Sequence, residues 1–150
     1  MRAVIQRCLY GKVIVEGEIV GKVDEGIVAL VGFSPTDNEK TMDYMLEKII
    51  NLRIFEDCDE KMNISLLDKK GELLIVPNFT LYGDARKGRR PGYSSAAIPK
   101  DAEEMFNTLV KKAKVLDLNK IENGIFQADM KVELINDGPI TLLLDSEKLF

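Results

Sequence analysis

The chain has 150 residues, of which 45% are hydrophobic, and this length and composition fit one domain with a proper core. No apolar run approaches the roughly 20 residues of a membrane span, which excludes a membrane helix. The net charge of −4 excludes a general attraction to nucleic acid, so any RNA contact must come from a local basic patch.

The first elements in chain order are predicted to be strands. Residues 2–9 alternate well enough for a strand that begins directly after Met1, so we expect no signal peptide. Residues 12–20 are typical of a hairpin that turns at Glu16 and Gly17. Residues 26–33 are continuously apolar, which favours a strand that is buried on both faces.

The first helix is predicted over residues 37–50. The segment from Thr36 to Glu39 has the pattern of a capping box. One apolar face follows at helical spacing: Met42, Met45, Leu46, Ile49 and Ile50. Residues 52–55 favour a short strand, and residues 56–70 are polar and loop-like.

The second half is predicted to alternate between strands and one further helix. Residues 73–76 favour a strand that ends at Pro77, and residues 83–97 have an irregular pattern. A second helix should start near Pro99, with this apolar face: Ala102, Met105, Phe106, Leu109, Val110 and Ala113. Residues 130–134 alternate, and residues 142–144 are expected to pair with them across a turn. We therefore predict a single α/β domain over residues 1–150, with a mixed sheet and two main helices on one side.

Two residue types are scarce in ways that bear on chemistry. The chain has no histidine, so an enzyme with this sequence must work without the commonest general base. Its two cysteines, Cys8 and Cys58, are far apart and lack metal-ligand spacing, which argues against a zinc site. We expect them to have packing roles in a reducing cytoplasm.

The turn Asn136-Asp137-Gly138-Pro139 is the most informative stretch of the sequence. Glycine offers no side chain, and proline has a fixed φ and no N–H, so such a turn displays backbone carbonyls rigidly. The plain alternative is a tight hairpin turn with no other role. Arg7 has two interpretations as well: it lies on the wet face of its strand, or it donates to the carbonyls of a special turn.

Two further segments carry possible chemistry. Backbone N–H groups of Phe79-Thr80-Leu81 could stabilise a developing oxyanion, although local sequence alone favours an ordinary edge strand. The only dense basic cluster could neutralise RNA phosphates or be a solvated loop; it comprises Arg86, Lys87, Arg89 and Arg90. Tyr82 and Tyr93 flank the cluster and could stack on bases or simply pack.

Several segments, taken in order, resemble the D-aminoacyl-tRNA deacylase family over the whole chain. They are Ile5-Gln6-Arg7, Val15-Glu16-Gly17, Arg53-Ile54-Phe55, Lys61-Met62-Asn63, Phe79-Thr80-Leu81, Arg86-Lys87-Gly88-Arg89-Arg90-Pro91, Phe126-Gln127-Ala128-Asp129-Met130 and Asn136-Asp137-Gly138-Pro139-Ile140-Thr141. The resemblance implies a three-layer β/β/α fold, a homodimer with its active sites at the subunit interface, and no metal or other cofactor. It also implies a cytoplasmic enzyme that hydrolyses D-aminoacyl-tRNA, and glycyl-tRNA mischarged on tRNA(Ala), at the 3′ acceptor end.

The same resemblance implies roles for individual residues. Gly138 and Pro139 match a Gly-cisPro dipeptide that enters the other subunit's pocket and rejects L-aminoacyl groups, and Arg7 matches the residue that holds it. Phe79 and Thr80 match the segment at the scissile ester, where the ribose 2′-hydroxyl is thought to assist attack. The remaining roles are a pocket wall at Ala128 and Met130, a pocket position at Asn78, and tRNA contact at Arg86, Lys87, Arg89 and Arg90.

The sequence departs from the family at one place, because Pro77-Asn78 stands where Ser-Gln is usual. Related animal deacylases that act on some L-alanyl-tRNAs also have proline at the first of these positions. Two alternatives to a D-specific deacylase therefore stay open. One is a relaxed deacylase that also cleaves some L-aminoacyl-tRNAs, and the other is a non-catalytic dimer that binds RNA ends.

Overall fold

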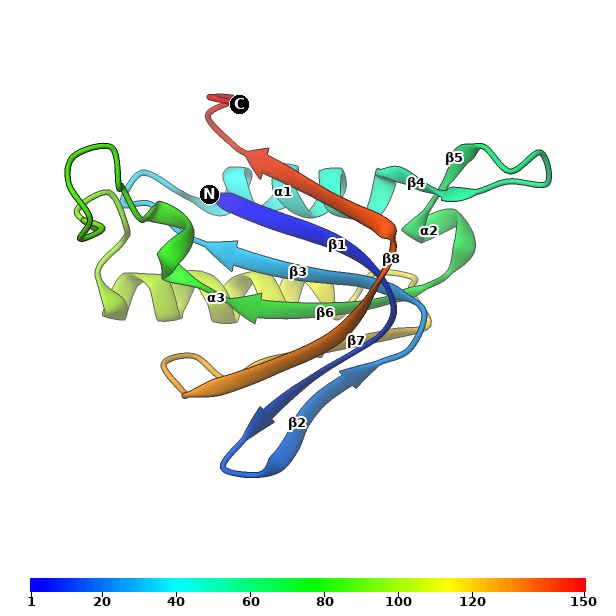
Figure 1. Ribbon diagram of the computed structural model, residues 1–150, viewed down its shortest axis with the longest axis horizontal. Helices are drawn as coiled ribbons and strands as arrows, with labels where there is room; N and C mark the ends of the chain where they lie inside the picture. Colours follow the sequence, from blue (N-terminus) through cyan, green and yellow to red (C-terminus); the bar gives the residue numbers. More distant parts are fainter.

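A six-stranded, strongly curved sheet runs through the computed structural model, which describes residues 1–150 (Figure 1). Its strand order is β2-β1-β3-β6-β7, with β8 pairing with β1. The bounds are β1 (Arg2–Val15), β2 (Glu18–Val23), β3 (Gly26–Gly32), β6 (Glu72–Pro77), β7 (Lys120–Asn123) and β8 (Met130–Asp145). Strand β3 runs parallel to β6, and β6 runs parallel to β7, whereas β1 pairs antiparallel with all its neighbours, so the sheet is mixed as predicted.

The remaining elements are short or helical. Helices α1 (Glu39–Asn51) and α3 (Pro99–Ala113) are the two main ones, and α2 (Leu66–Lys69) and the 3₁₀ turn η1 (Phe79–Tyr82) are single turns. Strands β4 (Arg53–Glu56) and β5 (Met62–Ser65) form a separate hairpin that projects from one end of the molecule (Figure 1). None of the helices has the length and apolar character to cross a membrane.

Two hydrophobic cores divide the molecule into the expected β/β/α layers. The larger core lies between the sheet and helices α1 and α3, and it includes the predicted α1 face from Met42 to Ile50. The smaller core lies on the other face of the sheet, where strands β1 and β2 curve over β3 and β6. It is centred on Cys8, Val28 and Leu74. Strand β3 faces both cores, which confirms the prediction that its continuous apolar run is buried on both sides.

Some local predictions are confirmed and others are wrong. Glu16 and Gly17 have positive φ and form the β1–β2 turn, as predicted. The capping box of α1 is instead made by Asn38 and Thr41, because Asp37 turns inward to bind the Met1 ammonium and the Ser34 N–H. Residues 56–70 hold β5 and α2 rather than a loop, and β7 was not predicted.

The largest correction concerns the C-terminal strands. Residues 130–134 and 142–144 do not pair with each other; both belong to β8 and pair antiparallel with β1. Register runs from Arg2 with Asp145 to Gln6 with Thr141, and resumes at Cys8 with Asn136. Residues 137–140 therefore form a bulge opposite Arg7, because proline cannot donate to the ladder and Gly138 has a φ of +113°.

Candidate functional site

A mainly apolar cavity of about 1110 Å³ opens at the carboxyl ends of the parallel strands β3 and β6. The start of α3 and the segment before and within β8 complete its walls. The lining includes Val31, Phe33, Pro77, Asn78, Phe79, Tyr93, Ile98, Ala128 and Met130. A cleft of this kind, with few polar groups, suits a flat, partly apolar ligand.

The turn η1 forms one wall of the cavity, and its geometry overturns the expected edge strand. Asn78 caps the turn, and its Oδ1 accepts hydrogen bonds from both the N–H and the hydroxyl of Thr80. The backbone N–H of Asn78 donates to Val31 O at 2.7 Å, which ties the turn to β3. The N–H of Phe79, at the first position of the turn, has no intrahelical acceptor.

Gly32 makes this packing possible, although sequence analysis did not single it out. A Cβ at Gly32 would lie 2.8 Å from the Asn78 carbonyl oxygen and 3.4 Å from Leu81 Cβ. Any other residue would therefore push η1 away from β3. The only sequence signal was a glycine at the end of an apolar run, which does not reveal what approaches it.

Aromatic side chains differ in their access to the cavity. Phe79 is 58% exposed as a residue, and its ring meets the Tyr93 ring edge-on, with centroids 5.1 Å apart. Tyr82 is buried, so the prediction that it stacks on bases is wrong. The same burial raises the pKa of its hydroxyl. Tyr93 remains available for such a contact.

The bulge of β8 is built around a buried arginine. Arg7 Nη1 donates to Ile54 O at 2.7 Å, and Nε lies 2.8 Å from Asp137 Oδ2 as an ion pair without hydrogen-bond alignment. The interpretation that places Arg7 on the wet face is therefore wrong, because only 6% of the residue is exposed. Asn136 Nδ2 donates to both Arg7 O and Ile140 O, which closes the base of the bulge.

Within this bulge the Gly138–Pro139 peptide bond is cis. Neither residue lines the cavity, and neither does Arg7. The structure therefore brings Asn78, Phe79, Ala128 and Met130 together at one place, as well as Arg7, Gly138 and Pro139 at another. Thr80 lies between Phe79 and the rest of η1 but does not line the cavity.

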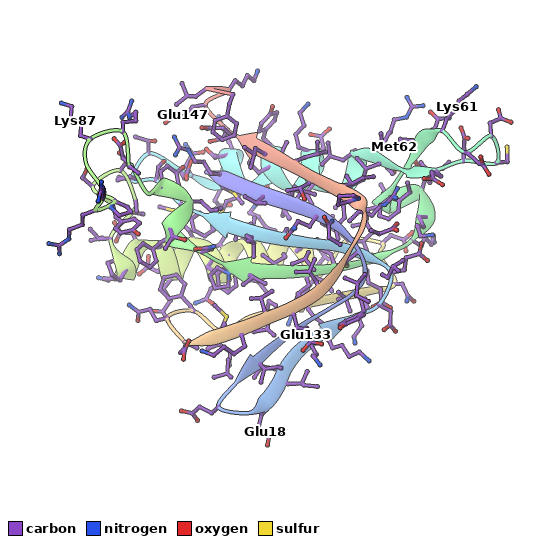
Figure 2. The ribbon with its side chains drawn as sticks, in the orientation of Figure 1. Glu18, Lys61, Met62, Lys87, Glu133 and Glu147 are labelled. Carbon is purple, nitrogen blue, oxygen red and sulfur yellow. The ribbon has the colours of Figure 1, made fainter.

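The basic cluster sits on an exposed loop outside the cavity, and Figure 2 shows Lys87 projecting into solvent there. Its four cations are not equivalent. Arg86 is held by both oxygens of Asp84, at 2.9 Å from Nε and 2.7 Å from Nη2, and this contact keeps the pKa of Asp84 far below its usual range. Lys87, Arg89 and Arg90 form none of the ion pairs in the structure.

The titratable groups of the chain offer little acid–base chemistry at the cavity. Burial raises the pKa of the Cys8 thiol to about 11, so at neutral pH it is not a thiolate nucleophile. Cys58 is exposed, so its predicted packing role is wrong. The Thr80 hydroxyl donates to an amide oxygen rather than to a base. Asp129 is the one carboxylate among the lining residues, and it is ion-paired with Lys131 at 2.8 Å. Backbone donors such as the Phe79 N–H are therefore the groups best placed to stabilise negative charge at this cavity.

Comparison with known proteins gives a consistent result. The family model described as D-Tyr-tRNA(Tyr) deacylase matches residues 4–145. Proteins named D-aminoacyl-tRNA deacylase from Kosmotoga olearia and Thermosipho africanus are 55% and 56% identical over 150 residues, which is 100% of each chain. A solved structure titled c-Myc DNA Unwinding Element Binding Protein is 37% identical, with a TM-score of 0.91 over 97% of this chain and 98% of that one. A second, titled as a probable eukaryotic D-amino acid tRNA deacylase, has a TM-score of 0.80 at 16% identity, over 95% and 97% of the two chains.

Proposed function

The chain belongs to the D-Tyr-tRNA(Tyr) deacylase family and is a D-aminoacyl-tRNA deacylase, and from this premise we propose how its two regions divide the reaction. The cavity beside η1 binds the 3′ end of aminoacyl-tRNA, and the bulge of a second subunit selects the chirality of the aminoacyl group. The products are free tRNA and the D-amino acid.

The single observation that carries this proposal is the backbone of η1 at the cavity wall. The Phe79 N–H starts the turn without an intrahelical acceptor, so it is free to donate to the ester oxygen as negative charge develops. Asn78 occupies both the Thr80 N–H and hydroxyl, which fixes the turn and leaves Thr80 with no base to activate it. The 2′-hydroxyl of the substrate's terminal ribose then assists the attack of water on the ester.

The shape and lining of the cavity support a terminal nucleoside as its occupant. Its volume of about 1110 Å³ exceeds what an amino acid alone would fill, and most of its lining is apolar. Ala128 and Met130 form one wall, and Tyr93 offers an aromatic edge near Phe79. Recognition of an unpaired RNA end by stacking and by its 2′-hydroxyl is the usual mode for RNA-binding proteins.

A second copy of the chain is needed because Gly138 and Pro139 lie outside their own cavity. Their bulge is anchored by Arg7 and Asn136 and presents a glycine that has no side chain to block a close approach. Leu9, Ile135 and Leu143 remain exposed on the paired strands β1 and β8 around it, and a dimer would cover them. In a homodimer, each bulge enters the partner's cavity and leaves no room for an L side chain.

Two finer features follow from this arrangement. Glycyl-tRNA mischarged on tRNA(Ala) is also a substrate, because glycine has no side chain for the bulge to reject. The exposed cations Lys87, Arg89 and Arg90 contact the acceptor stem, and Arg86 contributes less because Asp84 holds it. Such an enzyme acts where aminoacyl-tRNA is made and used, in the cytoplasm.

A deacylation assay tests the proposal directly. Purified protein should release the amino acid from D-tyrosyl-tRNA and glycyl-tRNA and leave L-tyrosyl-tRNA intact. Equal cleavage of the D and L substrates would overturn chiral rejection and favour the relaxed deacylase that Pro77-Asn78 suggests. Binding of tRNA without any cleavage would instead identify a module that only binds RNA ends.

A further inference from the structure

Arg2, the first residue of β1, connects three segments that are far apart in the sequence. Its Nη1 donates to Leu81 O in η1 at 3.2 Å, and its guanidinium carbon lies 4.6 Å from the centre of the Tyr82 ring. Its Nε lies 3.2 Å from Asp145 Oδ2 at the end of β8. One side chain therefore contacts η1 at two consecutive residues and the C-terminal end of the sheet.

Asp145 keeps Arg2 in this position. Its side chain is only 2% exposed, and its second oxygen, Oδ1, accepts the Glu147 N–H at 2.8 Å. The Phe150 ring lies 5.7 Å from the guanidinium carbon, in addition to the Tyr82 contact. The planar guanidinium is thus held by a buried carboxylate and two aromatic rings, a setting that lysine reproduces only in part.

The contact falls at the end of η1 that Asn78 does not hold. Asn78 caps the first residues of the turn. The Leu81 carbonyl belongs to the last residues, whose carbonyl oxygens have no N–H donor within so short a helix. The Arg2 hydrogen bond supplies a donor at that point. With both ends fixed, the direction of the Phe79 N–H at the cavity wall is fixed as well.

We propose that Arg2 is a positioning residue for deacylation, acting through Leu81 and Tyr82 on the η1 backbone that receives the ester. The inference rests on the proposed function, which places the scissile ester at the Phe79 N–H. Arg2 does not touch the substrate: it does not line the cavity, and its guanidinium contacts the far end of the turn. Its loss should therefore affect the chemical step more than substrate binding.

The test compares kcat and KM of Arg2→Met, Arg2→Lys and Asp145→Asn with the wild type, using D-tyrosyl-tRNA. We expect Arg2→Met to lower kcat about tenfold, because small misplacements of a catalytic donor have large effects, while KM changes by less than about twofold. Arg2→Lys should recover part of the loss, since it can pair with Asp145 and donate to Leu81 O. Asp145→Asn should lower kcat in the same direction.

Arg53→Met is the matched control, because Arg53 also donates to a backbone carbonyl, Asn63 O at 2.8 Å, but in the β4–β5 hairpin. Figure 2 shows Met62 of that hairpin at the opposite end of the molecule from Lys87. The kcat of Arg53→Met should match that of the wild type. Circular dichroism at the assay temperature gives the folded fraction, and Arg2→Lys and Asp145→Asn decide the matter if Arg2→Met does not fold.

The outcomes separate the two ideas. An Arg2→Met enzyme that matches a fully active wild type overturns the positioning role and leaves the proposed function intact. A loss of kcat in Arg2→Met that is no larger than its unfolded fraction also overturns the positioning role. A wild type that cleaves no D-aminoacyl-tRNA overturns the proposed function, and this inference with it.

Discussion

The cavity wall at η1 and the bulge of β8 are both turns held by an asparagine and a distant arginine, but they face different places. Asn78 caps η1 and Arg2 donates to its Leu81 carbonyl, whereas Asn136 closes the bulge and Arg7 pairs with its Asp137. The cavity is complete in one chain, but the bulge lines no cavity of its own.

In the proposed function this difference in placement separates two tasks. The region at η1 offers a free backbone donor beside a large cleft for ester hydrolysis, and the selection of D over L groups is assigned to the bulge. The bulge offers a rigid edge without catalytic chemistry.

The largest effect should come from removing the proposed backbone donor. Phe79→Pro deletes the N–H at the first position of η1, where proline fits the backbone, and Asn78 already has the extended conformation that precedes proline. We expect kcat to fall about 10²–10³-fold, as for the loss of one oxyanion donor. Phe79→Leu keeps the N–H and is the control. Similar rates for the two variants in the deacylation assay would rule out a role for this donor.

Distortion of the bulge should have the next largest effect. In Gly138→Ala, at a φ of +113°, the new Cβ would lie 2.9 Å from Ile140 Cγ1 and 3.3 Å from Arg7 Nη2. We expect kcat/KM for D-tyrosyl-tRNA to fall about a hundredfold, because a displacement near 1 Å has this effect in a positioned site. Gly17→Ala is the control, since Gly17 also has positive φ but no neighbour within 4 Å. Equal losses in both variants would point to a general effect on stability.

Mixing the two variants tests whether the regions meet across a dimer. Phe79→Pro and Gly138→Ala chains, unfolded and refolded together, should regain about one quarter of wild-type activity, because half of the dimers are mixed and each has one intact site. Each variant refolded alone should stay inactive. Activity of the mixture no higher than the average of the separate samples would mean that one chain supplies both regions.

The basic loop should have a moderate effect that spares the chemistry of both regions. Replacing Arg89 and Arg90 with alanine should weaken tRNA binding several-fold and reduce the slope of log K against log salt by about 0.9 per lost contact, the value for a duplex such as the acceptor stem. Arg86→Ala should change less, because Asp84 already neutralises that guanidinium. Filter binding at several salt concentrations measures both. An unchanged slope would argue against contact at this loop.

The smallest effect is expected from the threonine beside the donor. Thr80→Ala removes a hydroxyl that donates to Asn78, but it keeps the Thr80 N–H, which donates to the same oxygen. Activity should stay within about threefold of the wild type, since the loss is one exposed hydrogen bond. A loss comparable to that of Phe79→Pro in the same assay would mean that the hydroxyl takes part in the reaction.

Sequence patterns predicted the parts of the fold that depend on local repetition. The helical face from Met42 to Ile50 and the doubly buried strand β3 were correct, because burial imposes its period on the chain. The short elements β5, α2 and β7 were missed, since a few residues carry too little periodicity. The motif from Asn136 to Pro139 was recognised, but its surroundings were not, because a hairpin and a bulge share the same turn residues.

By itself, the sequence determined the α/β class, the two main helices and the lack of histidine chemistry, which follow from residue types and their spacing. The resemblance to the family, carried by its motifs, implied the β/β/α layers. Only the tertiary structure decided that Asn78 caps a 3₁₀ turn, that Arg7 is buried against Asp137, and that the Gly138–Pro139 bulge lies outside its own cavity. The physical reason is that the burial of Arg7 and the place of the bulge depend on contacts between distant segments, and η1 is tied to β3 by the bond from the Asn78 N–H to Val31 O. A long strand β1 pairs with both halves of β8 and thereby sets where the bulge projects.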